Sequence, residues 1–306
     1  GSIIPIRPRN INSDLFSKHF SENWQEHSDA VKRVIEILYG KRGYYDYDFK
    51  HISADVLGNV YENYLGYKLS QSEKGLTLDK AAGKRKEQGI YYTPASIVDC
   101  IVRNALGSIL DNCISVNDLK KIKILDPACG SGSFLVKALG VIVEKYVDFN
   151  YEDSENLRKQ IILENLYGVD LDAQAVELTK LNLLLNTLRE REPLPPLDEN
   201  IRNGNSLISG TDEELEKYFG KNYRDKKPYY WRKEFLEVYK QGGFDVIIGN
   251  PPWVESKKLD KIDKKYFEDS YQVARRQYDL FTIFIEKALK LLKPNGILGF
   301  IVPNRY

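Results

Sequence analysis

Beyond residue 90, short apolar runs alternate along the chain with longer segments whose apolar residues recur every three or four positions. Short apolar runs are typical of buried strands, and the longer spacing is typical of amphipathic helices. The expected strands are "KIKILD" (121–126), "NLYGVD" (165–170), "NIRNGNSL" with its turn (200–207), "FDVIIG" (244–249) and "GILGFIVP" (296–303). The expected helices are 132–146, 173–188 and 280–293. This alternation predicts an α/β fold, a mostly parallel sheet with helices on both faces.

The turns that follow the expected strands carry polar residues suited to chemistry. Asp126 and Asp170 each end a strand, and Asn250 comes directly after another. Ligands of parallel α/β sheets bind beyond the carboxyl ends of the strands. We therefore expect these turns to converge on one cleft.

The first 88 residues have a different pattern and form the first of two expected domains. Apolar spacing predicts helices at 30–38 and 53–69, and so a small helical domain. The Gly- and Lys-rich segment 72–89 reads as a loop or linker. Residues 89–306 form the second expected domain.

Three segments concentrate charge. "KRK" at 84–86 is either a phosphate contact or part of a solvated loop, and 210–240 is a charged, aromatic insertion between strands. Segment 255–276 mixes basic and acidic residues, and two interpretations stay open for it: a loop that orders over DNA phosphates, or a solvated mobile loop.

Composition excludes several classes of protein. The 306 residues are 42% hydrophobic, with a net charge of +1, so global charge does not indicate a nucleic-acid binder. No apolar run is long enough for a membrane span. The three cysteines lack paired spacing, which favours a reducing cytoplasm over a disulfide or zinc framework. The chain begins Gly-Ser and has no methionine, so we expect a segment of a longer protein preceded by a cloning remnant.

"ILDPACGSGSFL" at 124–135 has the pattern of a strand, a tight turn and the start of a helix. Gly130 and Gly132 let the backbone approach a ligand closely, and the turn matches neither the dinucleotide nor the P-loop pattern. Asp126 would repel a pyrophosphate but attract an ammonium or sulfonium, and Asp170 is placed to accept from ribose hydroxyls. S-adenosylmethionine has these groups and no phosphate. The alternative is that both aspartates only cap strand ends.

"DPACGSG" followed by "NPPW" (250–253) resembles the adenine-N6 DNA methyltransferases of the gamma class, in which the cofactor motif precedes the catalytic one. "GIYYTP" (89–94) is similar to the upstream cofactor motif of that family, and 278–303 to its helix and strand after the catalytic loop. "DVLGNVYENYLG" (55–66) is similar to the helical segment of type IIG, Eco57I-like restriction–modification proteins, which are related to type I modification subunits. The resemblance covers roughly residues 50 to 306.

The resemblance implies a Rossmann-like, S-adenosylmethionine-dependent methyltransferase fold acting on double-stranded DNA with the target adenine flipped out. It implies that ten residues contact the cofactor, from its methionine end to its adenine ring. The ten residues are Tyr92, Thr93, Asp126, Ala128, Gly130, Gly132, Asp170, Leu171, Asn205 and Leu280. Asn205 stands where the family usually has an Asp. Leu280 and its neighbour Phe281 either wall the pocket or are simple core.

The resemblance also assigns the catalytic residues Asn250, Pro251, Pro252 and Trp253. The exocyclic nitrogen of adenine is a poor nucleophile that has to be oriented rather than strongly deprotonated. The Asn250 side-chain oxygen and the Pro251 carbonyl would accept its two hydrogens, and the prolines stiffen the loop. Trp253 would stack on the flipped base. This chemistry requires no metal ion.

Alternatives remain open at this stage. The same loop chemistry can methylate other acceptors: cytosine N4, RNA bases or protein glutamine amides. A different kind of function is also open, namely a non-catalytic DNA-binding specificity component that keeps the fold. The resemblance also implies a chain that stops before its last strands and before a target-recognition domain, with a nuclease fused or separate in the parent protein.

Overall fold

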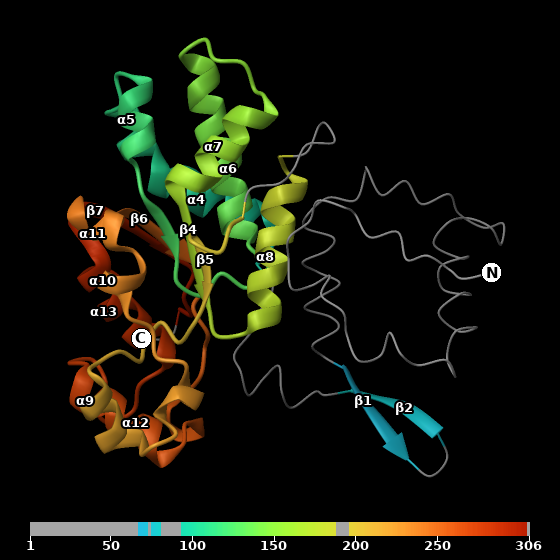
Figure 1. Ribbon diagram of the computed structural model, residues 1–306, viewed down its shortest axis with the longest axis vertical. Coiled ribbons are helices and arrows are strands. Elements are labelled where there is room, and N and C mark those ends of the chain that lie inside the picture. The colour runs from blue at the N-terminus through green and yellow to red at the C-terminus, as the bar shows by residue number, and fades with distance from the viewer. Residues whose placement is uncertain (1–66, 73–74, 81–92, 188–195, 305–306) are drawn as a thin grey trace.

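The computed structural model describes residues 67–72, 75–80, 93–187 and 196–304 (Figure 1). Its centre is a five-stranded sheet in the order β5-β4-β3-β6-β7, and every pairing within it is parallel. The strands are β3 (Ile124–Asp126), β4 (Leu166–Asp170), β5 (Ile201–Asn203), β6 (Phe244–Gly249) and β7 (Leu292–Phe300). The chain runs outward from β3 to β5 and then returns to β6 on the other side of β3, so the strand order reverses between β3 and β6.

Alternate residues of the central strands enter two different apolar clusters. Ile124 and Val246 face a cluster with the helices of one side, whereas Leu125 and Ile247 face a cluster with the other side. Period-two alternation puts successive side chains on opposite faces, so both faces of the sheet are buried. The first side is covered by α4 (Ala95–Asp111), α6 (Ser133–Asp148), α7 (Glu155–Asn165) and α8 (Ala173–Leu185), with the short α5 (Val116–Lys121) beside them. The second is covered by α10 (Trp231–Glu234), α11 (Leu236–Lys240) and α13 (Leu280–Leu291).

The expected α/β architecture is therefore confirmed, with adjustments at element ends. The strand expected at 121–126 begins only at Ile124, because Lys121 still belongs to α5. The strand expected at 296–303 begins at Leu292, directly after α13, and its register against β6 shifts between Phe244 and Val246. Pro294 and Asn295, which lie between the expected helix and the expected strand, are part of this irregular stretch of β7.

The N-terminal prediction of helix followed by loop is wrong where the structure describes it. β1 (Tyr67–Ser72) pairs antiparallel with β2 (Gly75–Lys80), so 67–69 is strand and not the end of a helix. The period-two alternation of Tyr67 with Leu69, and of Leu76 with Leu78, is a strand signal that the helical spacing upstream obscured. The helices expected at 30–38 and 53–66, the "KRK" at 84–86 and the domain boundary at 88 lie outside the described residues.

Two segments inserted after β5 and β6 fold against each other (Figure 1). We call them the aromatic lobe, residues 206–226 and 256–278. The lobe contains α9 (Asp212–Phe219), the 3-10 turns η4 (Tyr223–Lys226) and η5 (Ser256–Lys258), and α12 (Lys261–Ser270). Segment 255–276 is thus not simply a solvated loop, because it contains a helix that Asp260 caps by accepting from the backbone N–H groups of Ile262 and Asp263.

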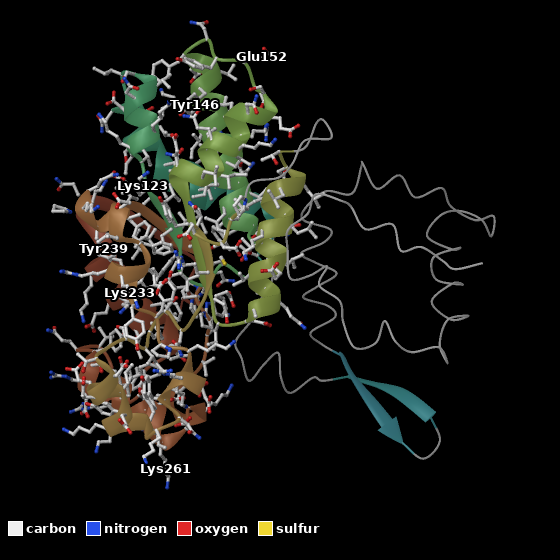
Figure 2. The ribbon with its side chains drawn as sticks, in the orientation of Figure 1. Lys123, Tyr146, Glu152, Lys233, Tyr239 and Lys261 are labelled. Atoms are coloured by element: carbon white, nitrogen blue, oxygen red, sulfur yellow. The ribbon has the colours of Figure 1, made fainter. Side chains whose placement is uncertain are left out.

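Side-chain contacts join the two segments of the aromatic lobe. Tyr218 Oη donates to Asp269 Oδ2 at 3.0 Å, and Lys226 Nζ lies 2.6 Å from Asp263 Oδ1. Tyr271 Oη donates to the Leu207 carbonyl at 2.5 Å, which ties the second segment to the end of β5. Stick representation shows side chains filling the space within the lobe as well as between the sheet and its helices (Figure 2). No helix among the described residues combines the length and apolarity needed to cross a bilayer.

Candidate functional site

The end of β3 supplies a deeply buried carboxylate. Asp126 is only 1% exposed, and its Oδ1 accepts from the Ala128 backbone N–H at 3.1 Å. Burial raises the pKa of Asp126 to about 8, and the nearby Asp170 adds to that rise. A carboxylate in this setting is stabilised by a cation that enters the cleft.

The end of β4 supplies a second carboxylate that organises the glycine-rich turn. Asp170 Oδ2 accepts from the Gly130 N–H at 2.8 Å, and its Oδ1 accepts from the Asp172 N–H at 2.9 Å. Burial raises the pKa of Asp170 to about 6 even though these backbone donors favour its charged form. The two aspartates expected at neighbouring strand ends therefore do share one edge, since β3 pairs with β4.

Helix α8 holds the glycine-rich turn from behind. Thr179 Oγ1 donates to the Gly130 carbonyl at 2.8 Å, and Asn182 Nδ2 donates to the Ser131 carbonyl at 2.7 Å. Gly132 has φ of 84°, and a Cβ there would lie 2.9 Å from Thr179 Cγ2. Sequence reasoning missed both α8 residues. The sequence carries no clear signal for them, because α8 also contains Gln174, Glu177 and Lys180, and only the structure shows that Thr179 and Asn182 are fully buried.

The strand β6 brings the "NPPW" loop against the buried carboxylate of Asp126. Gly249 has φ of 149°, and a Cβ there would lie 2.5 Å from Asp126 Oδ1, so no side chain fits between the two strand ends. The next residue, Asn250, follows at the point where the strand order reverses, the usual ligand position in such sheets. Asn250 Nδ2 donates to Thr93 Oγ1 at 3.1 Å, which adds the segment before α4 to the same site.

The far arm of the loop pairs with the residues that precede α13. The Ser256 N–H donates to the Tyr278 carbonyl at 2.7 Å, and the Leu280 N–H donates to the Val254 carbonyl at 2.9 Å. Leu280 and Ala128, both expected to contact the cofactor, pack against the same apolar cluster. Phe281 is buried. Pro251 is buried, and Pro252 and Trp253 are partly buried.

The remaining expected residues lie at the β4–β5 side of the cleft. Leu171 is 54% exposed, and its carbonyl accepts from Lys227 Nζ at 3.1 Å. Asn205 Oδ1 accepts from the Leu207 N–H at 3.0 Å, so this oxygen already closes a local turn and has one further lone pair for another donor. Tyr92 lies outside the described residues.

The comparisons with known proteins agree with this geometry. The model of the Eco57I restriction-modification methylase family matches residues 164–306, from the end of α7 through the loop at 250–253 and past β7. The chain carries an Eco57I-like restriction-modification methylase domain.

Relatives of this methylase domain cover nearly the whole chain. It is 29% identical to the type II restriction enzyme and methyltransferase RM.Eco57I of Escherichia coli, over 97% of this chain and 31% of that protein. It is 30% identical to the type I restriction enzyme MjaIX methylase subunit of Methanocaldococcus jannaschii, over 98% of this chain and 40% of that protein. The chain thus spans between about a third and two fifths of the length of these curated relatives.

Solved structures share the fold of the methylase domain. A DrdV–DNA complex superposes with a TM-score of 0.53 at 20% identity, over 90% of this chain and 26% of the other. The type IIL restriction-modification enzyme MmeI in complex with DNA gives a TM-score of 0.51 at 16% identity, over 83% of this chain and 33% of the other. These likenesses confirm the methyltransferase-type α/β fold expected from the sequence.

Proposed function

We propose that this domain transfers a methyl group from S-adenosylmethionine to N6 of an adenine flipped out of double-stranded DNA, as the modification part of a restriction–modification protein. The contact between Gly249 and Asp126 carries the proposal, because it joins the cofactor-side carboxylate to the strand that ends in Asn250. The relatives are named as a methyltransferase and a methylase subunit, which supports the reaction class. Two of the similar solved structures are complexes with DNA, which supports DNA as the substrate.

The residues at the strand ends fit S-adenosylmethionine. A buried carboxylate with a raised pKa, Asp126, suits a cationic ligand group, and Asp170 has the hydrogen-bond acceptors that ribose hydroxyls require. Gly130 and Gly132 have positive φ, which glycine adopts without strain, and nothing lies within 4 Å of the missing Cβ of Gly130, so a ligand can approach the main chain there. When bound, the cofactor supplies an electrophilic methyl group on a sulfonium.

Asn250 and the two prolines orient the acceptor amine. Asn250 Nδ2 donates to Thr93 Oγ1, which constrains the orientation of the amide. The Asn250 side-chain oxygen and the Pro251 carbonyl accept the two N6 hydrogens, and their fixed dipoles stabilise the positive charge that develops on nitrogen. The ring of Trp253 stacks on the extruded base and offsets part of the unstacking cost, at about 1–3 kcal/mol per stacked base.

The decisive experiment follows transfer of radiolabelled methyl groups into duplex DNA by the chain and by its full-length parent. Asn250→Ala should abolish incorporation, whereas the exposed Asn104, whose side chain donates to the Cys100 carbonyl and Sγ one helical turn earlier, provides the matched control Asn104→Ala. Incorporation retained by Asn250→Ala contradicts the catalytic assignment. Digestion of the product to nucleosides separates N6-methyladenine from N4-methylcytosine, and RNA and protein substrates test the other acceptors.

Calorimetry separates the enzyme from a non-catalytic specificity component. The domain should bind S-adenosylmethionine with or without DNA. A chain that binds duplex DNA but shows no cofactor binding at millimolar concentration favours the non-catalytic role. A nuclease and a target-recognition domain, which the parent protein or its partners would provide, complete the proposed system.

A further inference from the structure

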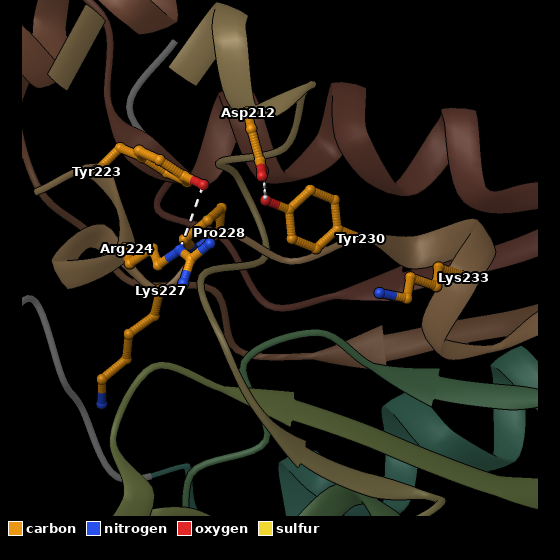
Figure 3. Close-up of a pocket in the computed structure, with 7 residues that line it drawn as sticks. All are labelled: Asp212, Tyr223, Arg224, Lys227, Pro228, Tyr230 and Lys233. Atoms are coloured by element: carbon orange, nitrogen blue, oxygen red, sulfur yellow. Dashed lines mark hydrogen bonds between the residues drawn. The ribbon is translucent and has the colours of Figure 1, made fainter. Parts of the chain in front are cut away.

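A pocket of about 500 Å³ opens where the aromatic lobe meets the helices of the sheet (Figure 3). All its lining residues come from the insertion between β5 and β6. They are Asp212, Tyr223, Arg224, Lys227, Pro228, Tyr230 and Lys233. The family resemblance assigns no role to this insertion, and neither the cofactor residues nor the catalytic loop line the pocket.

The pocket lining carries more positive than negative charge, with three cations and one carboxylate, Asp212. Among the described residues, Arg224, Lys227 and Lys233 form no ion pair with a carboxylate. The adjacent Lys226 behaves differently, since it pairs with both Asp260 and Asp263. The cation next to the pocket, Lys226, is thus paired with carboxylates, whereas the three cations that line the pocket are not paired within the described part of the chain. This is the arrangement expected for an anion site.

Hydrogen bonds to tyrosines order the pocket walls. Arg224 Nε donates to Tyr223 Oη at 3.3 Å, and Tyr230 Oη donates to Asp212 Oδ1 at 3.1 Å (Figure 3). Tyr223 is buried and forms a fixed wall for the guanidinium. The phenol on Asp212 occupies one acceptor position of the only carboxylate in the lining, so the basic side chains dominate the field in the pocket.

Main-chain contacts couple the pocket to the proposed active site. The Asn205 N–H donates to the Lys227 carbonyl at 2.7 Å, and Asn205 forms an isolated β-bridge with Pro228. Lys227 Nζ reaches the Leu171 carbonyl at the end of β4. The pocket is therefore attached to the same strand ends as the residues proposed to bind the cofactor.

We propose that the pocket binds a backbone phosphodiester of the DNA strand that delivers its base to the cleft. This assignment rests on the proposed DNA methylation. Phosphate oxygens match the guanidinium of Arg224 and the ammonium group of Lys233, and such contacts fix the register of the nucleic acid without reading its sequence.

The test measures binding of fluorescently labelled duplex DNA by anisotropy over a series of salt concentrations. The variant Arg224→Ala/Lys233→Ala removes two exposed cations and leaves Lys227, which contacts the Leu171 carbonyl. The control Lys121→Ala/Lys240→Ala removes the same total charge from exposed positions. These lysines lie in α5 and α11, which lead into the N-terminal ends of β3 and β6, whereas the proposed site lies at the carboxyl ends of the strands.

The pocket variant should lose roughly tenfold in DNA affinity at low salt, the equivalent of about 1.4 kcal/mol. Its plot of log affinity against log salt concentration should become shallower by about one to two units. The control should stay within about twofold of the wild type in affinity, and both variants should bind S-adenosylmethionine as the wild type does.

Three results overturn the assignment. The first is equal DNA affinity for the pocket variant and the control. The second is an equal loss of S-adenosylmethionine affinity, which makes the pocket part of the cofactor site. The third is binding of inorganic phosphate alone as tightly as DNA, which makes it a site for free anions. The proposed function is tested separately. If the pocket variant loses DNA affinity as expected but the full-length parent transfers no methyl group, the phosphate site stands and only the proposed function is contradicted.

Discussion

Asn250 Nδ2 lies 3.1 Å from Thr93 Oγ1, so the amide of the proposed catalytic loop is held by a residue 157 positions earlier in the chain. Thr93 is buried and stands directly before α4. The resemblance assigns Thr93 to the cofactor, and the structure adds a contact with the residue proposed to orient the acceptor. In the proposed reaction, the Thr93 hydroxyl would position the reacting amine indirectly, because it constrains the amide of Asn250.

Replacing Thr93 tests that positioning role. Thr93→Val keeps the shape but removes the hydrogen bond, and should lower kcat for methyl transfer by up to roughly tenfold, the upper end for a lost neutral hydrogen bond. Thr93→Ser keeps the hydroxyl and should restore the rate. Calorimetry with S-adenosylmethionine decides between the roles: a loss confined to cofactor affinity would show that Thr93 acts on the cofactor alone.

Gly249→Ala tests the close approach of β6 to β3. The added Cβ would lie 2.5 Å from Asp126 Oδ1, and φ of 149° is unfavourable for alanine. We expect the free energy of unfolding to fall by at least about 2 kcal/mol in urea denaturation. The matched control is Gly107→Ala in α4, where nothing lies within 4 Å of the new Cβ, and there alanine should stabilise by up to about 1 kcal/mol. Equal effects at both positions would contradict the packing argument.

Stability should depend on pH through Asp126. Burial raises its pKa from 3.8 to about 8, so at intermediate pH the folded chain keeps a proton that the unfolded chain has released. The free energy of unfolding should therefore fall as pH rises from about 4 to about 8. Asp126→Asn should remove most of this slope in urea denaturation at several pH values. A variant with the slope of the wild type would assign the pH dependence to other groups.

Cofactor binding should release a proton from the same carboxyl. At about pH 7 the Asp126 carboxyl is largely protonated, since its pKa is about 8. A cationic ligand beside it favours the charged form and lowers that pKa. Calorimetry of S-adenosylmethionine binding in buffers of different ionisation enthalpy should detect release of up to one proton, and Asp126→Asn should abolish it. Proton uptake would mean that the cationic part of the ligand lies elsewhere.

Tyr271→Phe probes how the aromatic lobe is anchored. The hydroxyl of this buried residue donates to the Leu207 carbonyl at 2.5 Å, and its loss leaves that carbonyl without this donor. The free energy of unfolding should fall by about 1–3 kcal/mol. The control, Tyr151→Phe, removes a hydroxyl from a residue that is 50% exposed, and should change stability by less than about 0.5 kcal/mol.

The sheet was predictable from sequence because strands buried on both faces are continuous apolar runs. Phe244–Gly249 and Leu166–Asp170 are such runs, and both aspartates at strand ends were placed at the correct edge. The prediction failed at Leu292, where helix passes directly into strand. Pro294 and Gly296 are ordinarily turn residues, but pairing with β6 on either side of them keeps this segment in the sheet.

Contacts between distant segments were not predictable in the same way. No local pattern indicates that Thr93 meets Asn250, because the contact depends on how α4 and β6 are placed by the whole fold. Charged composition likewise hid the helix at Lys261–Ser270, although Asp260 at its start is a recognisable capping residue. Composition identified the insertions, and tertiary packing determined that they form one lobe.

The two-segment construction of the aromatic lobe constrains how such domains can be recombined. Tyr218 belongs to one segment and its acceptor Asp269 to the other, and Lys226 and Asp263 are divided in the same way. A chimera that exchanges only one insertion with a relative would separate these partners and expose the aromatic faces that pack between them. Grafting therefore requires both segments as a matched pair, and substitutions in one segment constrain which residues the other can accept.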